Sequence, residues 1–457
     1  MLRLSEAMTA LNARRSGADA AFAGVTTDSR AVAAGDLFVA LKGERFDGHD
    51  YVAQVIAQGA AAALVDHIDP AWGDFPLLVV ADTRLALGAL AGFWRSRFTI
   101  PLVGLTGSSG KTTVKEMIAA ILRTQAGDEA VLATRGNLNN DIGLPLTLLG
   151  LRDSHRYAVI EMGMNHPGEI AYLSRIAKPD VALITNAQAA HLAGLGTVEA
   201  VAHAKGEIFE GLAAGGTAVI NADDPHAALW QVLAAGHRTI RFSLNQPSEV
   251  SGTCRPLSFG SEIDMVTAEG KFTVALPVPG EHNVRNALAA AAVAVALGIG
   301  NAAIATGLAK VASVKGRMQK NPCLHGATLI DDTYNANPAS VRAAIAVLAG
   351  LPGRKVLVLG DMGELGEGAR ALHAEIGAVA KAAGIDHLFT LGDLSAAAAE
   401  AFGQGGRHFE YIEDLLHDIE NLLAPEVVVL VKGSRFMQME RVVKSFVPRE
   451  DSTCCSH

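Results

Sequence analysis

Residues 106–113 have the side-chain types that hold the phosphates of a nucleotide: Thr106, Gly107, Ser108, Ser109, Gly110, Lys111, Thr112 and Thr113. Small residues let backbone N–H groups curl around phosphate oxygens, a lysine reaches the terminal phosphates, and a threonine hydroxyl can ligate Mg²⁺. Leu105 stands where the general form of this motif has glycine. The flanks still favour it, because residues 102–105 form an apolar run typical of a buried strand and residues 114–122 have apolar positions at helical spacing. We therefore predict a phosphate-binding loop between a strand and a helix.

Two later apolar runs also end in side chains suited to chemistry. Residues 157–160 are followed directly by Glu161, and residues 181–184 are followed a short way along by His191. Ligands collect at the carboxyl ends of strands in open α/β sheets, so we expect Glu161 and His191 near the phosphate loop. Glu161 offers a hard oxygen ligand for Mg²⁺. For an isolated histidine such as His191, a hydrogen-bonded loop position is the commoner explanation.

Amide and amine side chains in the central part of the chain are open to two interpretations. Asn137, Asn139 and Asn140 lie in a stretch of asparagine and glycine that predicts a loop, and three amides so close together can also hydrogen-bond a polar ligand. Lys205 falls among small and apolar residues of a helix predicted over residues 197–212, where a lysine usually extends its amine to solvent. Taken alone, these patterns assign Lys205 no chemistry.

Two further polar groups could contact a sugar or a base. Asp28 is followed by Ser29 and Arg30, a combination of carboxylate, hydroxyl and guanidinium that suits a sugar or diphosphate, although a solvated turn with an incidental ion pair is the default explanation. Asn283 and Asn286 lie at the predicted start of a helix. There they could face a base or ribose, or serve only as ordinary helix-start residues.

The composition is that of a globular protein of several domains. The chain has 457 residues, which corresponds to about three domains on a prior of roughly 150 residues each. Half of the residues are apolar and only 5% are aromatic, which suits small-residue helices packed on sheets. The formal net charge of −9 argues against a nucleic-acid partner, since no basic excess is present to neutralise a phosphate backbone.

Targeting signals and cysteine motifs are missing from the sequence. The first 15 residues lack the apolar core of a signal peptide, and the longest apolar run, residues 287–299, is shorter than the roughly 20 residues of a membrane span. Cys254, Cys323, Cys454 and Cys455 have no Cys-x-x-Cys spacing, which argues against a disulfide framework or a zinc site. We expect a cytoplasmic, soluble protein without membrane insertion, and a monomer.

The order of predicted elements indicates an α/β protein of three domains. Residues 1–84 alternate short strands and helices, beginning with a strand near residues 25–30, and predict a small domain. Residues 85–315 predict a central sheet with helices on both faces that carries the phosphate loop, with an excursion of paired strands over residues 241–276. Residues 316–457 repeat strand-to-polar-turn junctions and predict a Rossmann-like, doubly wound sheet.

These motifs together resemble the Mur ligases of peptidoglycan synthesis, nearly from end to end. The segments that carry the resemblance are residues 28–30 with 38–43, 106–113, 136–140, 161–163, Asn186 with His191, 204–207, Asn283, 316–317, 332–338 and 360–366. The phosphate loop of this family begins at the threonine, so Leu105 is no departure from it. The last two segments, with the asparagine-rich loop, resemble the D-alanyl-D-alanine-adding branch. The Asp-Asn-Pro-Arg motif of the diaminopimelate-adding relatives is not found in this sequence.

The resemblance implies a reaction and its substrates. ATP would phosphorylate the C-terminal carboxylate of UDP-N-acetylmuramoyl-tripeptide, and the amine of D-alanyl-D-alanine would attack the resulting acyl phosphate. Residues 1–84 would bind the UDP-sugar, with Ser29 and Arg30 among the contacts. Residues 85–315 would bind ATP, and residues 316–457 would form the ligase domain that closes on them.

It also implies roles for single residues. Lys111 would contact the ATP phosphates and Arg317 the γ-phosphate, with Asn283 and Asn286 near the adenine and Asp332 near the ribose. Thr112 and Glu161 would ligate one Mg²⁺, while His191 and a carbamylated Lys205 would belong to a second metal site. Asn137, Asn139 and Asn140, with Asn335 and Asn337, would contact the substrates, the last two near the incoming dipeptide.

Two alternatives stay open at this point. A sister carboxylate–amine ligase, such as a folylpolyglutamate synthase or another Mur ligase, would share the phosphate loop and differ in its acceptor. A nucleotide-binding scaffold would keep the loop without turnover, but it would have no need of the metal-site residues. The sequence does not tell whether the third residue of the tripeptide is lysine or diaminopimelate.

Overall fold

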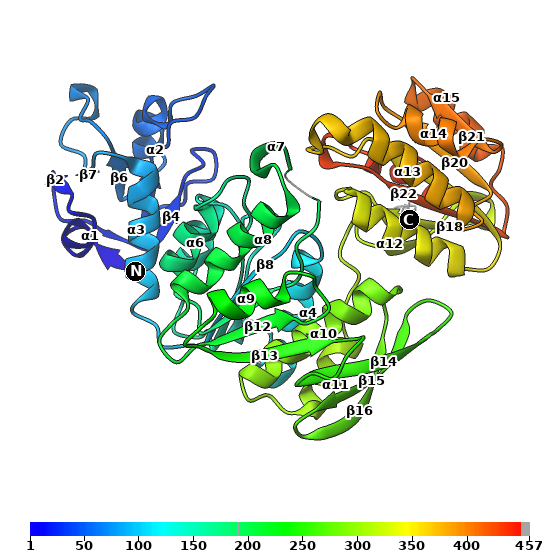
Figure 1. Cartoon of the computed structure of the whole chain (residues 1–457). Helices are drawn as coiled ribbons and strands as arrows, with labels where there is room; N and C mark the ends of the chain where they lie inside the picture. Colours follow the sequence, from blue (N-terminus) through cyan, green and yellow to red (C-terminus); the bar gives the residue numbers. More distant parts are fainter. Residues whose placement is uncertain (190–191, 449–457) are drawn as a thin grey trace, which may run out of the picture.

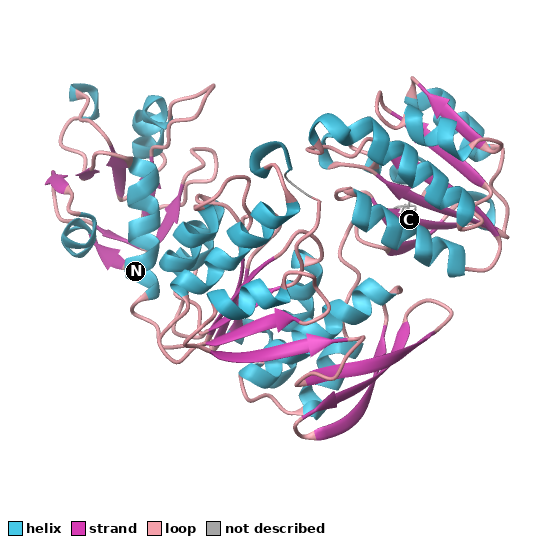
Figure 2. Ribbon diagram, in the orientation of Figure 1, coloured by secondary structure: helices cyan, strands magenta, loops and turns pink. Residues whose placement is uncertain are grey.

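The computed structural model describes residues 1–189 and 192–448. Three principal β-sheets follow one another along the chain, each covered by helices (Figures 1 and 2). The first sheet, blue in Figure 1, and the last, yellow to red, lie on either side of the cyan and green central part. The predicted α/β class is confirmed.

The first part of the chain is built on a five-stranded sheet in the order β2-β7-β6-β5-β4, parallel except for β2. Its elements are β1 Leu2–Arg3, α1 Leu4–Leu11, β2 Arg14–Ser16, β3 Ala21–Phe22, β4 Gly24–Thr26, β5 Asp36–Val39, the 3-10 turn η1 Gly48–Tyr51, α2 Val52–Ala57, β6 Ala62–Val65, the 3-10 turn η2 Pro70–Trp72 and β7 Leu77–Val79. Strands β1 and β3 pair separately. The elements before residue 24 are absent from the prediction, because the strands there have two or three residues and show no periodicity, and α1 is a helix of only 8 residues.

The central part is a nine-stranded sheet in the order β16-β15-β14-β13-β12-β11-β8-β10-β9. Its elements are α3 Thr83–Arg95, β8 Leu102–Thr106, α4 Lys111–Ala126, β9 Val131–Ala133, α5 Gly143–Leu149, β10 Tyr157–Glu161, α6 Glu169–Ala177, β11 Val181–Ile184, α7 Leu192–Leu195, α8 Val198–Gly206, β12 Thr217–Asn221, α9 Ala227–Leu233, β13 Arg238–Ser243, β14 Val250–Pro256, β15 Ser261–Thr267, β16 Gly270–Leu276, α10 Glu281–Ala296 and α11 Asn301–Ala309. Strands β14, β15 and β16 pair antiparallel, as predicted for residues 241–276.

Alternation along the central strands sends side chains into two cores. On β10, Val159 packs with α4, α10 and α11, whereas Ala158 and Ile160 face the other core. That second core also includes α3 and apolar residues of the first sheet, such as Leu64. Successive strand residues point to opposite faces, and parallel strands buried on both faces are apolar throughout. The first sheet is thus fixed to the central one by a continuous apolar core.

The third part is a six-stranded sheet in the order β17-β18-β22-β19-β20-β21, parallel except for β17. Its elements are β17 Gln319–Pro322, β18 Thr328–Asp332, α12 Pro338–Gly350, β19 Arg354–Gly360, α13 Ala369–Ala382, β20 His387–Leu391, α14 Ala396–Phe402, β21 Gly406–Phe409, α15 Ile412–Glu420, β22 Val427–Lys432 and α16 Glu440–Phe446. Helices α12, α13 and α14 pack with one core of this sheet, and α15 and α16 with another. This is the predicted doubly wound arrangement.

Two predicted elements end earlier than expected. The strand near residues 25–30 stops at Thr26, because the Asp28 carboxylate accepts a hydrogen bond from the backbone N–H of Arg30 at 3.0 Å and turns the chain. The helix over residues 197–212 ends as α8 at Gly206 and continues as the 3-10 turn η4, Glu207–Gly211. There the Glu207 carboxylate accepts the backbone N–H groups of Gly168 and Ala171 at the start of α6.

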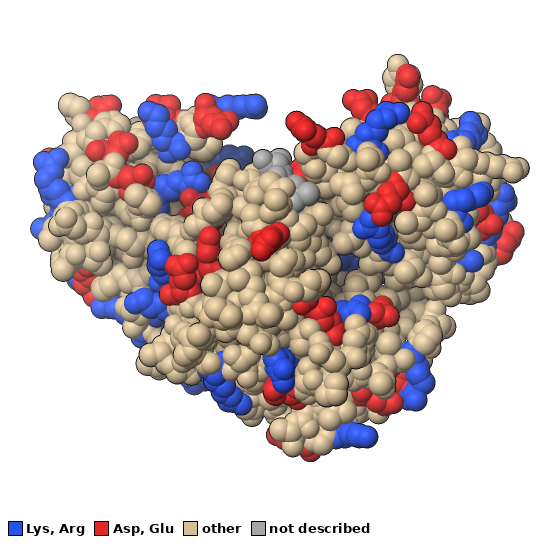
Figure 3. Space-filling model, viewed as in Figure 1, with Lys and Arg blue, Asp and Glu red and all other residues tan. Residues whose placement is uncertain are grey.

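The structure also bears on the sequence-based exclusions. In the residues described, no helix is long and apolar enough to cross a membrane. Cys254 and Cys323 are free thiols, and Cys454 and Cys455 lie outside the described residues. On the face drawn in Figure 3, Lys and Arg side chains are interspersed with Asp and Glu. The boundaries at residues 84 and 315 stay predictions.

Candidate active site

A cavity of ≈ 1120 Å³ lies where the central and third parts of the chain meet. Its walls include Ser108, Ser109, Gly110 and Lys111 of the phosphate loop, Asp82 and Arg84 at the start of α3, Glu161 at the end of β10, and Asp332, Asn335 and Asn337 after β18. The central and third sheets both contribute the carboxyl ends of parallel strands. This is where an α/β sheet binds ligands, so the cavity is the candidate active site.

The phosphate loop runs from the end of β8 to the first residue of α4, as predicted. Gly110 precedes α4 with φ 80°, and a Cβ atom there would lie 2.6 Å from Oδ1 of Asn286. Only glycine fits both the backbone angle and the close approach. The Asn186 side chain accepts the backbone N–H of Ser109 at 2.9 Å, which holds the loop from β11. The N-terminus of α4 is thereby presented to the cavity as an anion site.

Lys111 is poised in this loop with its amine held by the protein. Its Nζ donates to the carbonyl of Gly107 at 2.7 Å. Burial lowers the pKa of Lys111, and the charge of Glu161 opposes that shift. A ligand phosphate would take the place of a backbone carbonyl as the acceptor and offer the amine a stronger, charged hydrogen bond.

Glu161 and Thr112 form a buried pair of oxygen donors. Glu161 is 2% exposed, and its Oε2 accepts the Thr112 hydroxyl at 2.9 Å. Its Oε1 accepts Nδ2 of Asn139 at 2.8 Å. A carboxylate and a hydroxyl are ligands that Mg²⁺ prefers, so the donor set fits this ion. The predicted pairing of Thr112 with Glu161 is present in the structure.

Lys205 lies in the interior of the protein, and solvent does not reach its amine. The residue is 1% exposed on α8, and its amine has no hydrogen bond or ion pair to another of the described residues. Burial lowers its pKa well below the usual value, and the nearby Lys111 charge lowers it further. The initial interpretation of a lysine that reaches solvent is wrong. Lys205 does not belong to the cavity wall itself.

The third sheet brings its predicted residues to the phosphate loop. Arg317 donates from Nη2 to the Thr112 hydroxyl at 3.0 Å, and Asn337 donates from Nδ2 to the Ser109 hydroxyl at 3.1 Å. Asp332 accepts the Lys432 amine at 2.6 Å and lines the cavity with Asn335. Asn337 also caps α12, which fixes its position. The phosphate loop is therefore contacted by the third part of the chain as well as by the central part.

The start of α10 forms another wall of the cavity. Asn283 donates to the carbonyl of Pro279 at 2.7 Å, and Asn286 donates to Oδ1 of Asn283 at 3.1 Å. His282 lines the cavity beside them, and burial lowers its pKa to about 4. At neutral pH His282 is therefore an uncharged ring, suited to a base or ribose.

Some predicted residues lie apart from this assembly. Asn137, Asn139 and Asn140 line the cavity, but Ser29 and Arg30 do not. They follow β4, where the Arg30 guanidinium pairs with the Asp28 carboxylate at 2.9 and 2.8 Å and holds the pKa of Asp28 down at about 2. His191 lies outside the described residues.

Several cavity residues are missing from the sequence prediction. Asp82 follows β7 and caps α3. Arg84 pairs with Asp141, which comes directly after the asparagine-rich loop. Asp82 follows β7 closely, so it could have been predicted as Glu161 was, from its place after the carboxyl end of a strand. Tyr172 lies within α6, where a single aromatic residue gives no signal.

Comparison with known proteins places the chain in a family. Residues 21–92, 105–294 and 316–435 match models described as the Mur ligase family catalytic domain, the Mur ligase middle domain and the Mur ligase glutamate ligase domain. The UDP-N-acetylmuramoyl-tripeptide--D-alanyl-D-alanine ligase of Escherichia coli is 47% identical, with 99% of each chain covered.

Solved structures give the same result. MurF from Acinetobacter baumannii is 39% identical with a TM-score of 0.91, over 96% of this chain and 97% of that one. MurF ligase from Thermotoga maritima, solved in complex with ADP, is 29% identical with a TM-score of 0.81, over 92% of this chain and 96% of that one. The resemblance found in the sequence is thus confirmed over the whole chain.

Proposed function

The chain belongs to the Mur ligase family, and we propose that it is the ATP-dependent, ADP-forming ligase that joins D-alanyl-D-alanine to UDP-N-acetylmuramoyl-tripeptide. The observation that carries this function is the 47% identity, over nearly the whole of both chains, to an enzyme named for that reaction. The product is the UDP-linked pentapeptide of peptidoglycan synthesis. We place the enzyme in the cytoplasm, where ATP and UDP-linked precursors are made.

The reaction consists of two transfers. A carboxylate oxygen of the tripeptide attacks the γ-phosphorus of ATP, so that ADP leaves and an acyl phosphate forms. The free amine of D-alanyl-D-alanine then attacks the acyl carbon, loses a proton, and expels inorganic phosphate. Phosphoryl transfer to a carboxylate brings anionic groups together, so positioning and charge neutralisation supply most of the catalysis.

The chain's own residues fit these demands. Lys111 lies in the phosphate loop and Arg317 reaches it from the third part of the chain, so each can stabilise the negative charge that spreads over the transferred phosphoryl group. Asn335 and Asn337, on the third sheet, are assigned to the incoming dipeptide. Asn283, Asn286 and Asp332 are assigned to adenine and ribose.

Thr112 and Glu161 would hold one Mg²⁺, which when bound neutralises phosphate charge. We assign a second metal site to His191 and a carbamylated Lys205. Carbamylation needs a neutral amine, and burial, which lowers the pKa of Lys205, favours that form. Carbamylation would convert the amine into an anionic oxygen ligand. Ser29 and Arg30 are assigned to the UDP-sugar on the first sheet.

The test is ATP-dependent phosphate release with UDP-N-acetylmuramoyl-tripeptide and D-alanyl-D-alanine, omitting each in turn. Turnover should need both. Lys111→Ala should lower turnover by about 10²–10³-fold, the usual loss for one donor to a transition-state charge. Lys310→Ala, at an exposed position at the end of α11, is the matched control and should keep full activity.

Substrate replacement separates this proposal from the sister ligases. Turnover with a folate and glutamate, or with a single amino acid in place of the dipeptide, would contradict the assigned acceptor. Nucleotide binding by folded protein without turnover on any acceptor would instead favour the scaffold. Comparing lysine and diaminopimelate tripeptides would then identify the third residue of the acceptor.

A further inference from the structure

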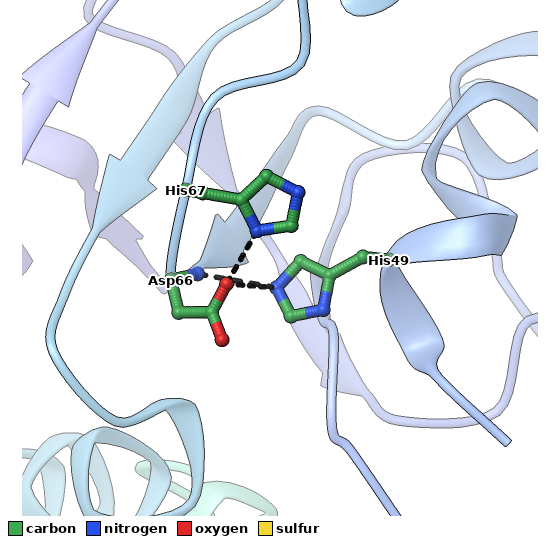
Figure 4. Close-up of side chains that lie close together, drawn as sticks. All are labelled: His49, Asp66 and His67. Carbon is green, nitrogen blue, oxygen red and sulfur yellow. Dashed lines mark hydrogen bonds and ion pairs between the residues drawn. The ribbon is translucent and has the colours of Figure 1, made fainter.

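Two histidines and an aspartate converge on the first sheet, away from the cavity just described. His49 lies in η1, and Asp66 and His67 follow β6 directly. Nδ1 of His67 lies 2.5 Å from Oδ1 of Asp66, and Nε2 of His49 lies 3.1 Å from the same oxygen (Figure 4). The three ligand atoms all lie within 4.8 Å of one another. None of these residues belongs to the cavity wall.

His49 is held by a second carboxylate on its far side. Its side chain is 5% exposed, and its Nδ1 lies 2.6 Å from Oδ1 of Asp47. A proton on Nδ1 bonded to Asp47 leaves Nε2 as the acceptor, which here takes the backbone N–H of Asp66 at 3.1 Å. A carboxylate behind a histidine fixes the ring and increases its basicity, and metal-ligating histidines almost always have such a partner.

We propose that His49, Asp66 and His67 bind a Zn²⁺ ion, which takes the place of the Asp66 backbone N–H at Nε2 of His49. Two imidazole nitrogens and one carboxylate oxygen are a ligand set that zinc uses, and solvent can supply the fourth ligand. The Asp66 and His67 side chains are 40% and 55% exposed, so the ion has an entry path and these side chains have room to adjust. The expectation of no zinc site rested on cysteine spacing alone. His49, Asp66 and His67 form no such motif, because only folding brings them together.

Such an ion would tie η1 to the end of β6. His49 and His67 come from separate segments, and their rings lie 4.7 Å apart between centroids, tilted by 32°. Trp72 of η2 packs beside both, at 5.5 Å from His67 and 6.4 Å from His49. Binding should therefore stabilise the first sheet and change the fluorescence of Trp72. This site is separate from the Mg²⁺ ligands of the proposed reaction.

The experiment uses the untagged full-length protein, stripped with a chelator and titrated with Zn²⁺ and, as a spectroscopic probe, Co²⁺. Wild type should bind at this site with a visible Co²⁺ absorption, a rise in melting temperature and a change in tryptophan emission. His67→Gln and Asp66→Asn should weaken that binding by at least about tenfold. His417→Gln, at an exposed position on α15, is the control and should bind as wild type does.

Two further measurements decide the outcome. Trp72→Phe should keep the zinc affinity and lose the emission change, which locates the ion beside Trp72. Asp47→Asn should weaken binding by about 10–100-fold although Asp47 is no ligand. Equal metal affinity in wild type, His67→Gln and Asp66→Asn, with all three folded, would overturn the proposal.

Discussion

Arg317 reaches from the segment before the third sheet to the phosphate loop, and its Nη2 donates to Oγ1 of Thr112 at 3.0 Å. The same guanidinium lies over the ring of Tyr334, 4.2 Å from its centroid. The third part of the chain thus touches the first turn of α4, where ATP phosphates are assigned. We therefore predict that closure of this part on the central sheet is coupled to nucleotide binding.

We predict that Arg317→Lys lowers kcat/KM for ATP by about 10–100-fold. Lysine keeps the charge but loses the planar fork and the stacking on Tyr334, so it holds the phosphate less well. Steady-state kinetics with ATP as the varied substrate measures the effect. Arg370→Lys, whose exposed side chain pairs with Glu400, is the matched control. Unchanged kinetics for Arg317→Lys would contradict a role for Arg317 in holding the ATP phosphates.

Glu161→Gln should raise the Mg²⁺ concentration needed for half-maximal activity by about tenfold or more. The amide is nearly isosteric and can still contact Thr112 and Asn139, but it lacks the negative charge that a hard cation needs. Activity is measured against Mg²⁺ concentration at saturating ATP. Glu210→Gln is the control. Glu210 is exposed and pairs with Arg175, so this variant should leave the Mg²⁺ curve unchanged. A lower maximal rate with the same Mg²⁺ requirement would argue against metal ligation.

His282 should make the protein less stable as the pH falls below about 6.5. Its pKa is about 4 in the folded state because of burial, with the Asp332 charge opposing and the Lys432 charge reinforcing the shift. The unfolded chain therefore binds the proton first, and stability declines from about pH 6.5 to about pH 4. The loss of folding stability between these pH values is at most roughly 3 kcal/mol. The actual loss should be smaller, because His282 faces the cavity.

The measurement is the free energy of unfolding by urea at pH 7.5 and at pH 5.0 for wild type and His282→Gln. The variant should lose less stability than wild type between these values, because glutamine does not titrate. His417→Gln, at an exposed position, should follow the wild-type curve. Identical pH dependence in wild type and His282→Gln would contradict the lowered pKa.

How far the sequence predicted the site depends on how local each signal is. Residues 106–113 and Glu161 lie at strand ends with regular apolar patterns before them, and the structure puts them together as expected. Lys205 was ambiguous, because its helix has apolar residues on most sides and burial cannot be read from such a pattern. The resemblance to a family, and not periodicity, gave it a role.

The fold was predicted in the same uneven way. The strands that carry long apolar runs, such as β8 and β10, match their predicted positions, since a run buried on both faces gives a clear signal. The short elements before residue 24 gave none. Contacts between distant segments, such as that between Asn337 and Ser109, depend on how the sheets pack and are not encoded in any local pattern.

Lys205→Ala should abolish activity, and short carboxylates added to the assay should restore part of it. In the structure Lys205 is 1% exposed, and burial lowers the pKa of its amine well below the usual value, which favours the neutral form that reacts with CO₂. The alanine variant leaves a space near Lys111 in which a small carboxylate can stand in for the carbamate. Formate and acetate are compared with chloride at equal ionic strength. Lys178→Ala, just after α6, should need no rescue. A folded Lys205→Ala protein that no carboxylate revives would argue against the carbamate.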